Sequence, residues 1–377
     1  MVINIFETDH KAIENYISGY ASNGHKLFGP IPYEDGYIFR VYAPAADKMY
    51  IKGDFTGWDI HQMNKNPQYG YFYIFENAKI GDYYKLVVVK DDKWVDHTDP
   101  FAKAMDFEGD FASLIVDETY EFSDDDFIKN RDKNFDKPMN IYEVHIGSWL
   151  RYKNDVNFLY IVDRLIDHVK EMGYTHVEIM PVTEYPYYPS WGYQSTGFFA
   201  TSSRYGKPED FKKFVDLMHQ NNIGVILDVV AVHFASDDYG LKTFDGTHLY
   251  ESHYEGLTYS EWGSINFDYS KGHVRSFMKS SFAYWIENFH LDGIRVDAVS
   301  YMIYYNGKKK RGVHKDNIDF ISDLNMTLEK DYPEVMLIAE DSSSYEGVTH
   351  PVKDGGLGFD YKWDLGWMND TIKYFKL

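Results

Sequence analysis

The sequence predicts a multidomain protein: an antiparallel β-sandwich followed by a TIM-type (β/α)8 barrel, of which about six β/α units are present. Two observations carry this prediction. Between about 36 and 118 the chain alternates short apolar runs with turns rich in Gly, Asp and Asn. From 139 onwards, strand-like and helix-like segments follow one another regularly, which is typical of a parallel sheet with helical crossovers.

The first part begins with a short amphipathic helix, expected over 1–22. An immunoglobulin-like sandwich is expected over 23–120, with strands at 36–44, 48–55, 71–77 and 82–90. Residues 121–138 are highly charged and poorly periodic, and we interpret them as a linker. Trp58, in the turn-like stretch GDFTGWD, is interpreted as a core residue of the sandwich rather than a sugar-stacking one.

The barrel is expected over 139–377. Its predicted strands are 140–148, 175–182, 223–230, 292–299, 334–341 and 357–365, and its predicted helices are 157–173, 208–222, 273–289, 316–332 and 366–376. A doubly wound sheet is the alternative architecture. That fold usually has a Gly-rich phosphate-binding turn after an early strand, and this sequence has none. Polar residues at the C-terminal ends of several strands favour the barrel.

Composition limits the partners. The net charge of −21 argues against nucleic acid and anionic membranes, and a neutral polymer suits such a surface better. The 34 Tyr, 26 Phe and 8 Trp suit sugar stacking, although compositional drift explains them equally well. The absence of Cys fits a reducing compartment. No signal peptide or long apolar run is recognisable, so we expect a cytoplasmic protein with no membrane partner.

Polar side chains follow five of the predicted strands. They are His145, Trp191 with Tyr193, Asp228 with His233, Arg295 with Asp297, and Glu340 with Asp341. Each alone has a structural explanation: His145 could be a packed core histidine, Asp228 a loop cap, Arg295 and Asp297 a structural ion pair, and Glu340 a solvated strand end. Their coincidence at successive strand ends indicates a site.

The predicted site combines three carboxylates with an arginine, imidazoles and aromatic rings. It has no Cys nucleophile, Gly-x-Ser-x-Gly elbow, P-loop or HExxH motif. A paired-carboxylate mechanism fits, and glycoside chemistry is its main user. Arg295, on the same strand face as Asp297, would favour the ionised form that a nucleophile needs. Glu340 would serve as the acid if less polar surroundings raised its pKa.

Three segments, GVILDVVAVHF, DGIRVDAVSYM and VMLIAEDSS, resemble three of the four signature segments of the α-amylase superfamily. NIYEVHIGSW, HVEIMPVTEYPYYPSWGYQSTGFFATSSRYGKPEDF and YGLKTFDGTHLYE are similar to the 1,4-α-glucan (glycogen) branching enzymes within it. FRVYAPAADKMYIKGDFTGWD resembles the carbohydrate-binding sandwich that precedes their barrel. The resemblance extends over about 23–377.

This resemblance implies the following roles. Asp297 is the nucleophile, Glu340 the acid and then the base, and Arg295 orients Asp297. Tyr193 stacks under the sugar, whose hydroxyls Asp228 and His233 hold. The partner is an α-1,4-glucan, and no metal or organic cofactor is implied. A calcium site common in the superfamily uses an Asn where this sequence has Val232, so no metal site is expected.

The sequence departs from the branching-enzyme pattern at Val229 and Ala231, where Trp and Pro are frequent, which could alter acceptor preference. The fourth signature, a His-Asp pair that supplies a third carboxylate, is not found before Leu377. We therefore expect little or no activity from this chain alone. Two other functions stay open: an α-glucan hydrolase of the amylase or debranching type, and a non-catalytic glucan-binding protein. The sequence leaves the oligomeric state unknown.

Overall fold

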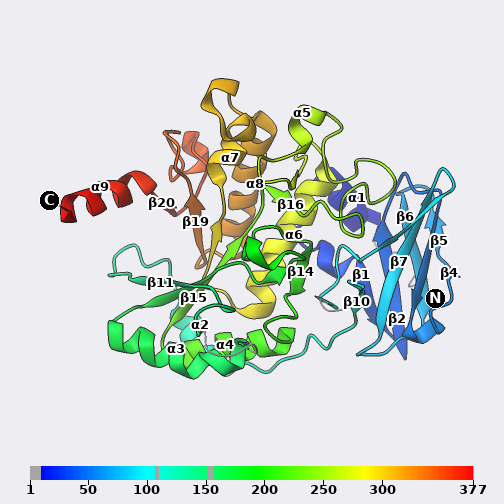
Figure 1. The fold of residues 1–377 in the computed structure, drawn as a ribbon, viewed down its shortest axis with the longest axis horizontal. Coiled ribbons are helices and arrows are strands. Elements are labelled where there is room, and N and C mark those ends of the chain that lie inside the picture. Colours follow the sequence, from blue (N-terminus) through cyan, green and yellow to red (C-terminus); the bar gives the residue numbers. More distant parts are fainter. Residues whose placement is uncertain (1–9, 107–109, 151–155, 377) are drawn as a thin grey trace.

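The computed structural model describes residues 10–106, 110–150 and 156–376 (Figure 1). An N-terminal part built from antiparallel strands lies beside a larger part in which strands and helices alternate. The larger part holds a six-stranded parallel sheet. The predicted fold class, a β-sandwich followed by part of a β/α barrel, is confirmed.

Two antiparallel sheets form the N-terminal part. The first has the order β1 (Gly29–Tyr33), β2 (Gly36–Tyr42), β6 (Tyr71–Glu76) and β5 (Asn64–Asn66). The second has the order β4 (His61–Gln62), β3 (Lys48–Gly53), β7 (Tyr83–Lys90), β10 (Ser113–Leu114) and β9 (Ala104–Met105), and β8 (Lys93–His97) pairs with β7. Alternate side chains of β2 and β7 face each other, and the rings of Phe39 and Tyr84 meet at 4.9 Å between centroids.

Trp58 does not enter this core. Its side chain is 42% exposed, and its Nε1 donates a hydrogen bond to Oδ1 of Asp54 at 2.9 Å. The interpretation of Trp58 as a core residue is therefore wrong. Trp58 follows Gly57 in a turn and has φ 69°, and its side chain lies on the surface of this turn.

The helix expected over 1–22 is seen as α1 (His10–Ser18), and residues 1–9 lie outside the described part of the chain. Its buried face, Ile13 and Tyr16, packs against α6 (Gly272–Phe289) of the larger part. The backbone N–H of Gly24 just beyond it donates to Oγ of Ser280 on α6 at 2.7 Å. Helix α1 thus joins the larger part to the sandwich, because the ring of Tyr16 also lies 5.9 Å from that of Tyr42 on β2.

The larger part is organised around six parallel strands that lie in the order in which they occur in the sequence. They are β11 (Ile141–Val144), β12 (His176–Ile179), β15 (Gly224–Val229), β18 (Gly293–Val296), β19 (Met336–Glu340) and β20 (Tyr361–Trp363). The crossovers use α3 (Phe158–Met172), α4 (Pro208–Gln220), α6 and α8 (Lys315–Asp331), and successive helices pack against one another. A strand order that never reverses is the order of a barrel, not of a doubly wound sheet.

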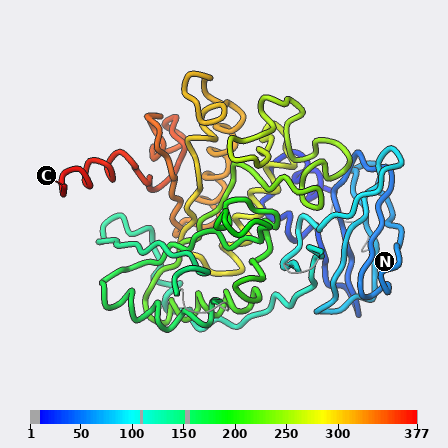
Figure 2. The backbone as a smooth tube through the Cα atoms, in the orientation of Figure 1, coloured from blue at the N-terminus to red at the C-terminus, as the bar shows by residue number. Residues whose placement is uncertain are grey.

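Short helices and strands lie in the connections between these strands and the crossover helices. They are α2 (Asp125–Asn130), β13 (Thr183–Glu184), β14 (Gly197–Thr201), β16 (His233–Phe234), α5 (Glu255–Thr258), β17 (Ile265–Asn266) and α7 (Val299–Ile303). The last helix, α9 (Leu365–Phe375), extends away from the body of the molecule (Figures 1 and 2). Its Trp367 and Phe375 are 72% and 80% exposed. No helix within the described ranges is long and apolar enough to cross a membrane.

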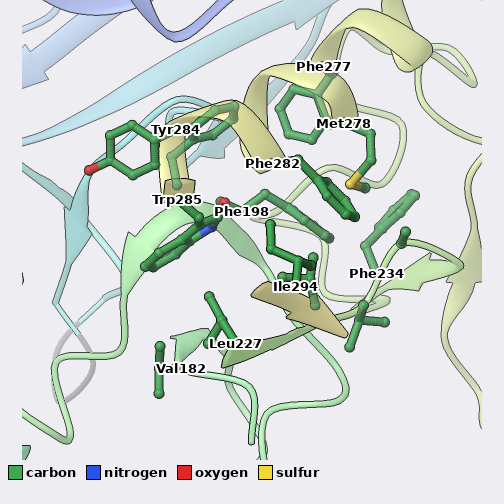
Figure 3. Close-up of a cluster of buried hydrophobic side chains, with 14 of the residues drawn as sticks. Val182, Phe198, Leu227, Phe234, Phe277, Met278, Phe282, Tyr284, Trp285 and Ile294 are labelled. Carbon is green, nitrogen blue, oxygen red and sulfur yellow. Dashed lines mark hydrogen bonds between the residues drawn. The ribbon is translucent and has the colours of Figure 1, made fainter. Parts of the chain in front are cut away.

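The apolar core lies between the parallel sheet and α6 (Figure 3). Leu227 of β15 and Ile294 of β18 point towards Phe282 and Trp285 of α6, and each of the four is fully buried. The indole Nε1 of Trp285 donates to the carbonyl oxygen of Phe198 at 2.9 Å, so its one polar atom is satisfied. This packing fixes β15 and β18, the two strands that carry Asp228, Arg295 and Asp297.

The stretch 121–138 is not a free connection between the two parts. Asp124 accepts hydrogen bonds from His219 Nδ1 (2.7 Å) and His290 Nδ1 (2.9 Å), and His219 Nε2 donates to Asp292 at 2.9 Å. The ring of Phe127 stacks on His219 at 4.1 Å. We call Asp124, His219, His290 and Asp292 the Asp124 clamp. It holds the stretch predicted as a linker at the N-terminal edge of the parallel sheet.

Candidate active site

The predicted polar residues meet at the C-terminal edge of the parallel sheet because the strands are in register. Asp228 on β15 is the direct register partner of Arg295 on β18. Asp297 follows β18 immediately, and Glu340 is the last residue of β19. Parallel strands of one sheet end at the same edge, so four residues from three strands are brought together there.

A single guanidinium joins two of the carboxylates. Nη1 of Arg295 donates to Oδ2 of Asp228 at 2.6 Å and to Oδ1 of Asp297 at 2.9 Å. Asp228 is 1% exposed, and the hydroxyl of Tyr193 also donates to its Oδ2 at 2.7 Å. A buried carboxylate is costly unless it is paired and hydrogen-bonded. The cost of placing an arginine in an apolar strand is therefore offset by two carboxylates at once.

The pKa of Asp297 differs from the expectation. Burial, followed by the charge of Asp228, raises the pKa of Asp297 to about 7, although Arg295 lowers it. Arg295 favours the ionised form of Asp297, as expected, but burial and then the charge of Asp228 outweigh it. Burial also raises the pKa of Asp228 from its usual range, against the opposing effect of Arg295. The two carboxyl groups compete for one positive charge.

His233, on β16, lies near the same C-terminal edge of the sheet, which we call the mouth, and its imidazole is neutral. Burial lowers the pKa of His233 to about 4. Its Nε2–H donates to the carbonyl oxygen of Tyr193 at 2.9 Å, which leaves Nδ1 as a buried atom with no protein partner in the described structure. A neutral imidazole with a free lone pair can accept a hydrogen bond from a ligand hydroxyl.

Glu340 is linked to Asp297 through the backbone. Its Oε2 accepts a hydrogen bond from the N–H of Ala298, the residue after Asp297, at 2.9 Å. Ala298 has φ 50°, in the left-handed region that non-glycine residues seldom adopt. This conformation turns the chain from β18 into α7 and points the Ala298 N–H at the carboxylate of Glu340.

The sequence reasoning missed Glu178, a buried carboxyl at the same edge. Glu178, on β12, is 2% exposed; its Oε1 lies 3.8 Å from Nε of Arg295, and Trp363 Nε1 donates to its Oε2 at 3.0 Å. Burial, followed by the charge of Asp228, raises the pKa of Glu178 to about 8. The signal was present in the sequence HVEIM, where one carboxyl interrupts an apolar strand.

Three of the predicted residues lie apart from this cluster. His145 contacts the Ser148 hydroxyl at 2.8 Å and the Tyr205 hydroxyl at 3.1 Å, as a packed core histidine would. Trp191 is 54% exposed, with its ring 6.1 Å from that of His145. Asp341 is fully buried and forms an ion pair with Lys362 at 2.9 Å. A cavity of about 1030 Å³ lies away from the cluster, between the sandwich and the loops around Tyr205.

The described part of the chain places no three His, Asp, Glu or Cys side chains together in a way that could hold a metal ion. The carboxylates of Asp228 and Asp297 at the sheet edge already share hydrogen bonds from the one guanidinium of Arg295. The chemistry available there is therefore that of carboxyl groups in a partly desolvated site, with a neutral histidine and a tyrosine beside them.

Comparison with known proteins finds relatives for both parts of the chain. Residues 157–245 match the model of the α-amylase catalytic domain, and residues 27–102 match that of carbohydrate-binding module 48, the isoamylase N-terminal domain. The chain is 42% identical to the 1,4-alpha-glucan branching enzyme GlgB of Fusobacterium nucleatum in an alignment of 376 positions that covers 97% of this chain. The chain is thus similar to this enzyme over most of its length, and to the α-amylase catalytic domain over 157–245. Its GlgB relative from Aquifex aeolicus is 41% identical over 90% of this chain.

The chain spans 61% of the length of the Fusobacterium protein and 57% of that of the Aquifex protein. A solved structure, the pullulanase of Paenibacillus barengoltzii, superposes with a TM-score of 0.68, covering 88% of this chain and 55% of the pullulanase, at 19% identity. That likeness supports the fold. The order found here, a module 48 sandwich before an α-amylase-type sheet, is the predicted one.

Proposed function

We propose that this chain provides the glycosyl-transferring centre of a 1,4-α-glucan branching enzyme. The reaction is retaining cleavage of an α-1,4 bond and transfer of the released chain to a 6-hydroxyl, which makes an α-1,6 branch. The observation that supports it best is the Arg295 bridge between Asp228 and Asp297 at the strand ends. Similarity to GlgB enzymes over 97% of the chain supports the choice of substrate.

In the proposed mechanism, the ionised Asp297 carboxylate attacks the anomeric carbon while Glu340 gives its proton to the departing 4-oxygen. The bond that forms is an ester between Asp297 and the sugar, and the bond that breaks is the glycosidic one. Glu340 then takes the proton of an acceptor 6-hydroxyl, whose oxygen displaces Asp297. The positive charge that develops on the sugar favours ionised Asp297, which offsets the raised pKa of this carboxyl.

The neighbouring residues position the substrate. The ring of Tyr193 would stack under the sugar, held in place by the bond from its hydroxyl to Asp228. Nδ1 of neutral His233 and the free Oδ1 of Asp228 are buried atoms without protein partners in the described structure, and both can accept hydrogen bonds from sugar hydroxyls. Arg295 fixes the direction of Asp297 through the 2.9 Å bond.

The test is whether Asp297 becomes glycosylated. α-Maltosyl fluoride has a good leaving group and needs little help from an acid, so intact-mass measurement should detect a maltosyl adduct on the chain. The adduct should map to the peptide 291–302 and disappear in Asp297→Asn. The matched control Asp238→Asn, whose side chain is 81% exposed, should keep it. An adduct that persists in Asp297→Asn would show that another residue is the nucleophile.

Amylose separates the possible acceptors. Loss of iodine colour without new reducing ends indicates transfer, whereas new reducing ends indicate an α-glucan hydrolase. Binding without turnover would favour the third function, a glucan-binding protein. The sandwich offers a surface for it, because Trp94 is 53% exposed and its ring stacks on Tyr50 at 5.0 Å.

A further inference from the structure

A second cavity, of about 290 Å³, lies behind the proposed catalytic mouth. We call it the Asn317 cavity. It is lined by residues from the loop 252–257, strand β17, the segment 301–306 and the N-terminal turn of α8. Its volume is near the lower end of the roughly 300–1,000 Å³ typical of small-molecule sites, and is far larger than one water requires.

Unpartnered polar atoms converge on this cavity. Asn317 is 8% exposed and donates through Nδ2 to the carbonyl of Met302 at 3.1 Å, but its Oδ1 has no partner in the described structure. Asn266 repeats the pattern: Nδ2 donates to the Leu257 carbonyl at 2.9 Å and Oδ1 is left over. Nδ1 of His314 is a third such atom. Buried polar atoms normally find partners, so three orphans around one cavity require a ligand or ordered water.

The available atoms are mostly hydrogen-bond acceptors. Two are amide oxygens, and the carboxylates of Asp268 and Asp316 also line the cavity. Burial lowers the pKa of His314, which keeps its imidazole neutral near pH 7. The carboxylates disfavour an anion, and the volume exceeds what a bare cation fills. A neutral ligand that donates several hydroxyl protons fits this set.

The walls provide flat apolar surfaces. The ring of Tyr305 lies 4.3 Å from that of His314, and Tyr301 and Phe267 also line the cavity. A pyranose has hydroxyl groups around its edge and C–H groups on its two faces. Hydrogen-bond acceptors suit the hydroxyl groups, and aromatic rings suit the C–H faces. We propose that the Asn317 cavity binds a neutral pyranose unit and serves as a second saccharide site of this protein.

The cavity is structurally connected to the mouth. Asn266 pairs with His233 in the β16–β17 ladder, and Val232, one residue before His233, lines the cavity. Tyr301 contacts Trp262 at 4.5 Å, and Trp262 contacts His233 at 5.4 Å. A sugar held in the cavity would be separated from the mouth by the β16–β17 pair. From there it would retain a second segment of glucan. The choice of a glucosyl unit rests on the proposed function, whereas the need for a hydroxyl-rich neutral ligand does not.

The experiment uses maltose as the probe, with methyl-labelled Met302 as a local reporter in NMR titrations. Met302 lies beside the cavity, because its backbone carbonyl accepts a hydrogen bond from Asn317, and its methyl signal is expected to shift when Asn317 takes a ligand. We expect a saturable shift in the wild type. The dissociation constant should rise at least tenfold in Asn317→Leu and in His314→Phe, which keeps the ring contact with Tyr305. The matched control Asn288→Leu, whose Asn also bonds a helix carbonyl, should bind normally.

A crystal soaked in maltose provides the second readout and also decides if Asn317→Leu fails to fold. Sugar density within hydrogen-bond distance of Asn266 and Asn317 supports the proposal. Density for water only, or unchanged affinity in both cavity variants, overturns it. Failure of the proposed function is read separately, from the Asp297 adduct, which Asn317→Leu should leave intact. Maltose bound in the cavity without an adduct on Asp297 would contradict the catalytic proposal and support the second saccharide site.

Discussion

Replacing His219 by Leu should strongly destabilise the protein, because this histidine joins the two buried aspartates of the Asp124 clamp. Its side chain is fully buried between Asp124 (2.7 Å) and Asp292 (2.9 Å). His219→Leu leaves two buried carboxylates without their shared cation. Removing one partner of such a pair typically costs about 3–5 kcal/mol. The unfolding free energy of the variant at pH 6 should be lower by about this amount.

The pH dependence follows from the pKa of His219. Burial alone lowers this pKa, but Asp292 and Asp124 more than offset burial and raise it from 6.5 to about 9. A raised histidine pKa stabilises the folded state fully below 6.5, and the stabilisation is lost as the pH rises through 9. One pKa unit corresponds to about 1.4 kcal/mol, so the wild type should lose about 3 kcal/mol of this contribution between pH 6.5 and 9.5.

Urea denaturation of both proteins at pH 6, 7.5 and 9.5, followed by tryptophan fluorescence, measures the effect. The gap between wild type and His219→Leu should narrow as the pH rises, since other titrating groups are common to both. The control His61→Leu breaks a half-exposed pair with Glu76 (2.8 Å) and should cost less than about 1 kcal/mol. If wild type and His219→Leu lose stability in parallel from pH 6 to 9.5, the charged clamp is not the cause.

Three further predictions concern the parallel sheet. Burial and then the charge of Asp228 raise the pKa of Glu178 to about 8, so the free energy of unfolding of the wild type should fall as the pH rises from 4.5 through 8. In urea denaturation, the free energy of unfolding of Glu178→Gln should equal that of the wild type at pH 4.5 and exceed it at pH 9. A difference that stays constant with pH would contradict this prediction. Asp228→Asn removes the charge that raises the pKa of Asp297, so a carboxyl-carbon NMR titration should show that pKa fall below 7; an unchanged value would refute the coupling. Ile294→Ala, fully buried, should cost about 2–5 kcal/mol in thermal or urea denaturation, whereas Ile60→Ala, 49% exposed, should cost less than about 1, and equal losses would argue against the core shown here.

The sequence predicted the parallel sheet well because burial on both faces leaves a simple trace. The runs GVILDVV and GIRV are apolar except for Asp228 and Arg295, and a segment with helical spacing comes later in the chain after each. The same trace located Asp228, Arg295 and Glu340, because a charge at the end of an apolar run stands out. Register then brought them together, as expected for parallel strands.

What the sequence could not predict depends on partners far away in the chain. Asp124 was placed in a linker because its partners, His219 and His290, are 95 and 166 residues away. The net pKa of Asp297 depends first on burial and then on the charge of Asp228, which lies on another strand. Trp58 was placed in the core from its residue type alone, and only the turn geometry shows it exposed.

The left-handed conformation of Ala298, after β18, limits which side chains position 298 can hold. The Ala298 N–H that bonds Glu340 belongs to the same peptide unit as the carbonyl of Asp297, so one rigid amide plane carries a strut between the two carboxyl-bearing residues. A β-branched side chain at 298 would clash in this conformation, while glycine would remove the strain but let the plane swing. Alanine is the compromise between these. The position of the Glu340 carboxylate relative to Asp297 is therefore tied to the main-chain torsion of Ala298.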